Sequence, residues 1–156
     1  MSIWVGEDAT VETLNSMSGG TMIATLGIEV TELGDDYLRG RMPVDGRTVQ
    51  PAGVLHGGAS VALAETLASW AGYLAVDRSR FHVVGQEINA NHIRPATPGT
   101  WVYAEVKPVN VGRRSHVWEI RITGENGKLV CISRCTLAVL EAPGQYASEG
   151  SRGTAS

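Results

Sequence analysis

One carboxylate stands in a stretch of sequence that is otherwise built from small, apolar and neutral residues. Between Gly53 and Val76 the chain reads GVLHGGASVALAETLASWAGYLAV, and Glu65 is the only Asp, Glu, Lys or Arg between Arg47 and Asp77. Burying an unpaired carboxylate is costly, because its charged form loses hydration. Perturbed carboxylates concentrate at functional sites, so we interpret Glu65 as a functional residue. The alternative is a structural Glu that meets an arginine or lies on a wet side of the helix.

Complementary groups precede this carboxylate in the sequence. The motif LHGG places Gly57 and Gly58 at the start of the predicted helix. Backbone N–H groups at a helix N-terminus can bind a developing oxyanion or polarise a carbonyl, although two glycines are also typical of a simple tight turn. His56 can orient a substrate or the loop, or serve as a structural histidine. Gln50 can donate its side-chain amide to the same carbonyl.

The spacing of these groups limits how they can cooperate. Gly57 and Glu65 are eight residues apart, which is about 12 Å along a helix axis. One small carbonyl cannot lie within about 3 Å of both groups, as catalytic geometry demands. Ser69 belongs with the carboxylate, because it emerges one turn later on nearly the same face; a packing role is the alternative. We therefore expect two antiparallel copies of the helix, related by a twofold axis, to share each site in a homodimer.

The elements that would carry these groups follow from the pattern of apolar residues. A long apolar helix is expected from about Gly57 to Ala75, and a short one from about residue 8 to residue 18. In YLRGRMPV, apolar residues and glycine alternate with two arginines, which is the period of a strand. The predicted strands are Thr21–Leu33, Tyr37–Val44, Val83–Ile93, Thr100–Asn110, Ser115–Thr123 and Leu129–Leu140. Turn motifs separate them, among them GENGK, whose Asn-Gly pair is typical of a hairpin.

The order of two strands, one long helix and four further strands indicates the α+β class. A curved antiparallel sheet of five to six strands can wrap around one helix, which would explain a helix that is apolar on all sides. The helix is slim enough for close contact, because it contains many alanines. We expect one domain over residues 1–141, edges that need a partner, and a disordered tail over residues 142–156.

Composition and length narrow the class of protein. A chain of 156 residues with a net charge of −3 fits one globular domain and carries no basic cluster for nucleic acid. Cys131 and Cys135 lie four apart in one predicted strand, too far apart to bridge without distortion, so we expect reduced thiols and a cytoplasmic location. The N-terminus lacks the pattern of a signal peptide, and the Gly53–Val76 segment is too interrupted to span a membrane.

Three segments together resemble a known family. QPAGVLHGGASVALAETLASWAGY, GQEINANHIRPATPG and VGRRSHVWEIRI are similar to the hotdog-fold acyl-CoA thioesterases. The resemblance is greatest to the branch that hydrolyses 4-hydroxybenzoyl-CoA and 1,4-dihydroxy-2-naphthoyl-CoA, and it spans residues 15 to 141. It implies a hotdog fold, hydrolysis of a thioester to free acid and coenzyme A, and tetramers built as dimers of dimers. Coenzyme A is part of the substrate, and neither another cofactor nor a metal is implied.

The resemblance also implies roles for individual residues. Glu65 matches the catalytic carboxylate, which acts as nucleophile or general base. The Gly57 N–H and the Gln50 side chain match the donors to the thioester carbonyl, and His56 matches the histidine beside them. Ser69 occupies the hydroxyl position one turn after the carboxylate. In the family, one subunit supplies the donors and the other supplies the carboxylate and the hydroxyl.

The groups that would contact coenzyme A are basic and polar residues near the mouth of the site. The candidates for coenzyme A binding are His92, Arg94, Arg113, Arg114 and Ser115. For Trp70 two roles stay open, which are shaping the acyl pocket and simple packing in the core. Two other functions stay open: a hotdog hydratase or dehydratase acting on acyl thioesters, and a non-catalytic module that binds acyl-CoA.

Overall fold

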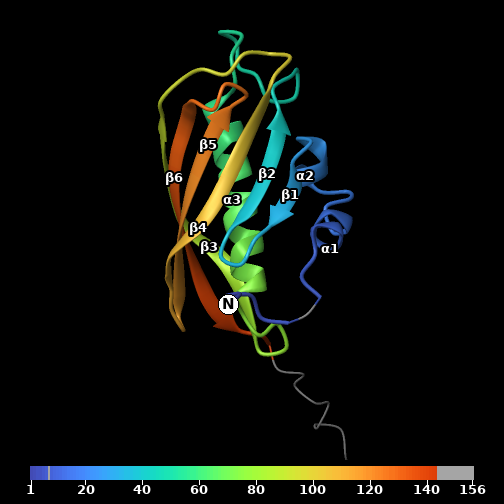
Figure 1. The fold of residues 1–156 in the computed structure, drawn as a ribbon, viewed down its shortest axis with the longest axis vertical. Coiled ribbons are helices and arrows are strands. Elements are labelled where there is room, and N and C mark those ends of the chain that lie inside the picture. The colour runs from blue at the N-terminus through green and yellow to red at the C-terminus, as the bar shows by residue number, and fades with distance from the viewer. Residues whose placement is uncertain (7, 144–156) are drawn as a thin grey trace, which may run out of the picture.

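One long helix crosses the inner face of a six-stranded antiparallel sheet in the computed structural model (Figure 1). The structure describes residues 1–6 and 8–143. The strands, in their spatial order, are β1 (Glu29–Leu33), β2 (Leu38–Pro43), β4 (Trp101–Val111), β5 (Ser115–Gly124), β6 (Leu129–Glu141) and β3 (Phe81–His92). The helices are α1 (Val11–Ser16), α2 (Met22–Thr25) and α3 (Gly57–Leu74). The predicted α+β class and strand number are confirmed, and the tail from residue 144 onward lies outside the described residues.

The long helix fits tightly because small residues face the sheet. α3 packs against β2, β3, β4, β5 and β6. A Cβ on Gly72 would approach Leu137 Cδ1 to 2.3 Å, and a Cβ on Gly40 of β2 would lie 2.8 Å from Leu67 Cδ2. Glycine at these two positions therefore lets the helix and the sheet approach closely, as the small residues of the sequence predict.

The sheet covers only one side of α3, and the expectation of a helix buried on all sides is wrong for the single chain. The twisted sheet cannot close around the helix, so the other side stays half-exposed (Figure 1). The buried residues are Ala59, Ser60, Leu63, Ala64, Leu67, Ala68, Ala71, Gly72 and Leu74. Beyond the first turn, the half-exposed residues of α3 are Val61, Ala62, Glu65, Thr66, Ser69, Trp70 and Tyr73. Glu65 thus lies on a partly open side of the helix.

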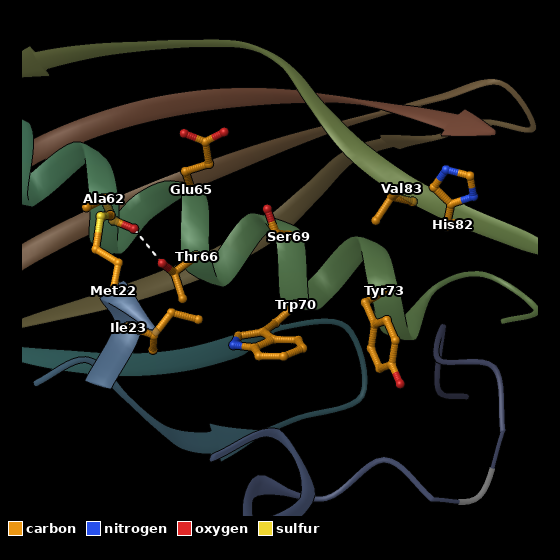
Figure 2. Close-up of a pocket in the computed structure, with 10 residues that line it drawn as sticks. All are labelled: Met22, Ile23, Ala62, Glu65, Thr66, Ser69, Trp70, Tyr73, His82 and Val83. Atoms are coloured by element: carbon orange, nitrogen blue, oxygen red, sulfur yellow. Dashed lines mark hydrogen bonds between the residues drawn. The ribbon is translucent and has the colours of Figure 1, made fainter. Parts of the chain in front are cut away.

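The predicted strand Thr21–Leu33 is wrong in its first half. Residues Met22–Thr25 form α2, whose N-cap Thr21 accepts a hydrogen bond from the Ile23 N–H. Side-chain capping by Thr satisfies an otherwise free backbone donor and favours a helical turn at this point. The strand β1 begins only at Glu29. The preceding helix α2 lies near α3 (Figure 2).

The predicted short N-terminal helix and the two reduced thiols are both present, the helix with narrower bounds. α1 is shorter than the predicted helix and begins at Val11, because the Thr10 hydroxyl accepts from the Thr13 N–H at 3.0 Å and caps it. Cys131 and Cys135 are free buried thiols on β6. None of the helices in the described part of the chain is long and apolar enough to cross a membrane. Residues 1–6 and 8–143 likewise contain no cluster of His, Cys, Asp and Glu suited to a metal ion.

Candidate active site

The carboxylate of Glu65 lines a pocket between α3, α2 and the start of β3 (Figure 2). The pocket has a volume of about 410 Å³. Its lining residues are Met22, Ile23, Ala62, Glu65, Thr66, Ser69, Trp70, Tyr73, His82 and Val83. Most of these side chains are apolar or aromatic, so the pocket suits an apolar group placed next to a carboxylate.

Polar and aromatic side chains occupy different sides of this pocket. Glu65 and Ser69 point from the same side of α3, one turn apart, whereas Trp70 and Tyr73 point the other way (Figure 2). The two aromatic rings pack edge to face, with centroids 5.7 Å apart. The Thr66 hydroxyl is committed to the Ala62 carbonyl at 2.6 Å. The Glu65 carboxylate and the Ser69 hydroxyl are therefore the polar groups that remain available to a ligand on this side of α3.

A second pocket, of about 330 Å³, lies at the N-terminus of the same helix. Its lining residues are Gln50, Val54, Leu55, Gly57, Ser60, His92, Ile93, Arg94, Pro95, Ala96 and Val130. Glu65 and Ser69 are absent from this lining. A single chain thus brings together the predicted donors in one pocket and the predicted carboxylate and hydroxyl in another.

A tight turn orients Gln50 in the second pocket. The Gly53 N–H donates to the Gln50 carbonyl at 2.8 Å, and Pro51 occupies the second position of this turn, which its fixed φ favours. Gly53 has a φ of +77°, a left-handed conformation suited to glycine. The Gln50 Oε1 accepts from the Ala52 N–H at 3.0 Å. This bond holds the side-chain amide in place, and its NH₂ is the group of Gln50 that can donate to a ligand.

The start of α3 leaves its first donor free. His56 is the N-cap, and its Nδ1 accepts from the Gly58 N–H at 2.8 Å. For the Gly57 N–H, the structure gives no acceptor within residues 1–6 and 8–143. A neutral His56 with a protonated Nε2 fits this arrangement, so the histidine acts as a helix cap that leaves the Gly57 donor exposed to the pocket.

The residues predicted to contact coenzyme A fall into two groups, one in the second pocket and one outside both pockets. His92 lies directly against the helix N-terminus, because a Cβ on Gly57 would be 2.8 Å from its Nε2. Arg94 lines the same pocket and donates to the Leu129 carbonyl at 2.9 Å. Arg113 and Arg114 are exposed in the turn between β4 and β5, and Ser115 begins β5; none of these three lines either pocket.

Two further ionisable groups, Cys135 and His116, are buried in the core. Burial, reinforced by the nearby negative charges of Glu65 and Glu87, raises the pKa of the Cys135 thiol to about 12. Burial also lowers the pKa of His116, which is 1% exposed and packs edge to face on Trp118, 5.9 Å between ring centroids. A protonated thiol is a poor nucleophile, and His116 lines neither pocket. In the first pocket Glu65 is the carboxylate, and His82 of β3 also lines it.

Sequence reasoning missed several residues of the first pocket. Met22 and Ile23 fall within the predicted strand Thr21–Leu33, and Tyr73 has no predicted role beyond its place in the apolar helix. Gly85 on β3 was also missed, although a Cβ there would lie 2.5 Å from Glu65 Oε1. A glycine inside a strand pattern signals a bulge or a close approach, so that signal was present in the motif GQEINANH.

The chain is similar to known thioesterases over nearly all of its described length. A family model described as the thioesterase superfamily matches residues 52–131. The chain is 51% identical over 131 residues to the 1,4-dihydroxy-2-naphthoyl-CoA hydrolase of Escherichia coli, covering 84% of this chain and 95% of that protein. It is 53% identical to the proofreading thioesterase EntH of Cronobacter turicensis, covering 84% and 94%. A crystal structure of a mutant thioesterase from Pseudomonas aeruginosa matches with a TM-score of 0.87 and 45% identity, covering 90% and 100%.

The fold and these similarities define the class. A long helix on a six-stranded antiparallel sheet, with thioesterases as structural neighbours, is the hotdog fold of thioester hydrolases. The chain belongs to the thioesterase superfamily. The predicted fold, family and enzyme class are thereby confirmed, whereas the roles of individual site residues stay predictions.

Proposed function

We propose that the protein hydrolyses aromatic acyl-CoA thioesters, giving the free acid and coenzyme A, at a site completed by a second copy of the chain. The observation that carries the proposal is the separation of the two pockets along α3. The Glu65 carboxylate lines one, and the Gly57 N–H with the Gln50 amide lines the other. Each pocket holds half of the chemistry that thioester hydrolysis needs.

A free sheet edge supports the proposed dimer. β3 is an outer strand of the sheet and is 12 residues long, with most of its residues exposed. Such an edge is a template for pairing with another strand, and pairing with the β3 of a second copy gives a closed twofold dimer. β3 is also the strand whose Gly85 lies against Glu65. Pairing at this edge therefore places the half-exposed side of α3 near its counterpart, with the two helices antiparallel. A tetramer would then form as a dimer of dimers.

The chemistry of the shared site follows from the available groups. The Gly57 N–H, at the positive end of the helix dipole, and the Gln50 NH₂ donate to the thioester carbonyl oxygen and stabilise the negative charge that develops there. Glu65 from the other copy either attacks the carbonyl carbon, giving a mixed anhydride and the coenzyme A thiolate, or removes a proton from an attacking water. Ser69 orients that water or the carboxylate.

The lining of the carboxylate pocket supports an aromatic acyl group. Trp70, Tyr73 and Met22 offer flat and polarisable surfaces beside Glu65. The E. coli relative is named for 1,4-dihydroxy-2-naphthoyl-CoA, whose acyl group is aromatic. We propose this compound and 4-hydroxybenzoyl-CoA as substrates, with coenzyme A held by His92, Arg94 and the arginines of the β4–β5 turn. A cytoplasmic location fits the reduced cysteines and is part of the proposal.

The decisive experiment is a release assay on purified protein with a panel of aryl-CoA and alkyl-CoA substrates, compared by kcat/KM. Release of free thiol, fastest with aryl-CoA, supports the proposal. A change in double-bond absorbance without thiol would instead identify a hydratase, and binding without either would identify a non-catalytic module. His56 caps the helix through Nδ1 and does not line the Glu65 pocket, which argues against His56 as the histidine that a hydratase would pair with this carboxylate.

Single-turnover hydrolysis in ¹⁸O-labelled water separates the two roles of Glu65. In the anhydride route, the water oxygen enters the Glu65 carboxylate when the anhydride is cleaved at that carbon. In the general-base route, the label enters only the released acid. Mass spectrometry of the peptide that contains Glu65 reads the difference.

A further inference from the structure

A glycine of strand β3 lies against the carboxylate of Glu65, and nothing else occupies the space that its side chain would fill. A Cβ built on Gly85 would meet two heavy atoms within 4 Å, Glu65 Oε1 at 2.5 Å and Glu65 Cδ at 3.7 Å. Real Cβ atoms essentially never approach another heavy atom to 2.5 Å. An alanine at this position would therefore have to displace the carboxylate.

The backbone does not explain this glycine. Gly85 is not among the residues with a positive φ, so any amino acid could adopt its extended conformation. The residue is exposed in the single chain, and a Cβ built on it would meet no apolar side chain within 4 Å. It differs in this respect from Gly72 of α3, whose Cβ would strike Leu137 of the core. The structure gives one reason for a glycine at position 85, which is that a larger residue would take the space of the Glu65 carboxylate.

The strand is also irregular at this point. The pairing of β3 with β6 shifts register between Gly85 and Glu87, so Gln86 is an extra residue in the ladder. Bulges of this kind are frequent next to active sites, where they bend a strand and change the direction of nearby groups. The glycine and the bulge together indicate that β3 is shaped around the carboxylate rather than for regular pairing.

We infer that Gly85 is a positioning residue that forms the seat of the Glu65 carboxylate and sets its distance from the thioester carbon. This inference rests on the proposed function of Glu65 and adds a residue that acts through it. A Cβ at position 85 would push the flexible end of the Glu65 side chain, which costs little in folding but moves the reacting atoms. A displacement of about 1 Å can reduce turnover on the order of a hundredfold.

The test compares Gly85→Ala with Gly124→Ala, a matched change at a strand glycine. At Gly124 a Cβ would make only ordinary contacts, 3.4 Å to Asn126 Oδ1 and 3.7 Å to Val130 Cγ2. Gly85→Ala should lower kcat for thiol release by about tenfold to a hundredfold, with KM and the melting temperature close to those of wild type. Gly124→Ala should leave kcat unchanged.

A double-mutant cycle adds a readout that a purely structural role would not move. Glu65→Asp shortens the side chain by about 1.5 Å and makes room for a Cβ at position 85. The combined variant Gly85→Ala/Glu65→Asp should therefore lose less activity than the product of the two single losses. Crystal structures of wild type and Gly85→Ala should show the carboxylate displaced in the variant.

Three results would overturn the inference. The first is a kcat of Gly85→Ala equal to that of Gly124→Ala. The second is a loss of kcat in Gly85→Ala/Glu65→Asp equal to the product of the two single losses. The third is a melting temperature of Gly85→Ala that falls in proportion to its activity. A protein that releases no thiol from any substrate would refute the proposed function instead. The crystal structures would then still decide whether Gly85 seats the carboxylate.

Discussion

The two pockets of α3 differ in what they offer to a ligand. The pocket at Glu65 presents an anionic acceptor among apolar and aromatic side chains, whereas the pocket at Gly57 presents N–H donors from a helix end, an amide and two basic residues. A thioester needs both kinds of group around one carbon atom. In the proposed reaction, each copy of α3 therefore supplies two unlike halves of a site, and neither half is complete alone.

The halves are also supported differently. The donor half is fixed by backbone hydrogen bonds: the His56 N–H donates to the Thr48 carbonyl at 2.8 Å, and the Leu55 N–H donates to the Ala96 carbonyl at 2.9 Å. The acceptor half depends on the flexible side chain of Glu65, whose carboxylate lies against Gly85. We expect the donor half to be preorganised and the acceptor half to be sensitive to small changes in neighbouring side chains.

The largest effect should come from removing the acceptor. Glu65→Ala and the isosteric Glu65→Gln should each lower kcat on the order of 10²–10⁴-fold, because neither side chain can attack or accept a proton. Folding and assembly should be unaffected, since Glu65 is half-exposed and makes no salt bridge among those of the described residues. Thiol-release kinetics, thermal unfolding and size-exclusion chromatography measure these properties.

Glu119→Ala, which changes a carboxylate on β5, is the matched control and should keep wild-type turnover. Near-wild-type turnover of Glu65→Ala would remove the basis for the acceptor half altogether.

The next effect should come from deleting one donor without changing the helix. Proline is tolerated at the first helical position, and His56 has a φ of −72° and a ψ of 131°, which suits a residue before proline. Gly57→Pro removes the N–H, whereas Gly57→Ala adds a comparable steric load near His92 and keeps it. We expect Gly57→Pro to turn over about 10²–10³-fold more slowly than Gly57→Ala.

Both Gly57 variants should retain the helical circular-dichroism signal of wild type. Equal kcat values for the two would show that the Gly57 N–H takes no part in the reaction.

Mixing the two defects tests whether the halves come from different copies. Glu65→Ala subunits and Gly57→Pro subunits, refolded together in equal amounts, should form mixed dimers in half of the cases. Each mixed dimer would have one intact site and one doubly defective site, so the mixture should recover about a quarter of wild-type activity. The measurement is kcat before and after mixing, and each variant refolded alone is the control. No recovery from mixed dimers would place both halves within one chain.

A structural feature of this protein could be predicted from the sequence when residues close together in the chain determine it. The alternation in β2 and the Asn-Gly turn between β5 and β6 were predictable, because neighbouring residues determine them; Gly127 indeed has a φ of +74°. The spacing of Gly57 and Glu65 likewise follows from helix geometry alone. Gly57 and Glu65 accordingly line two different pockets, whereas the predicted Arg113, Arg114 and Ser115 line neither.

Features that depend on distant contacts were not predictable. The residues of α2 have the β-branched and apolar composition of a strand. They form a helical turn instead, because Thr21 caps the turn and its side chains pack beside α3. The half-exposed side of α3 depends on how far the sheet curves, which no single segment encodes. The seat at Gly85 required knowing that β3 lies beside Glu65, 20 residues earlier in the chain.

The smallest effect should come from the exposed arginines of the β4–β5 turn. Arg113 and Arg114 lie outside both pockets of the single chain, so their proposed contact with coenzyme A is limited to phosphate charge at the protein surface. An exposed ion pair contributes about 0.2–1 kcal/mol, which corresponds to a rise in KM of up to about fivefold for each alanine variant. Turnover should not change, because the reacting atoms are elsewhere, and the difference in KM should shrink as salt is added. Arg134→Ala, which removes an exposed arginine from β6, distinguishes a specific contact from a general effect of net charge. If all three variants raise KM equally, the turn holds no subsite, and the donor pocket with His92 and Arg94 is left to bind coenzyme A.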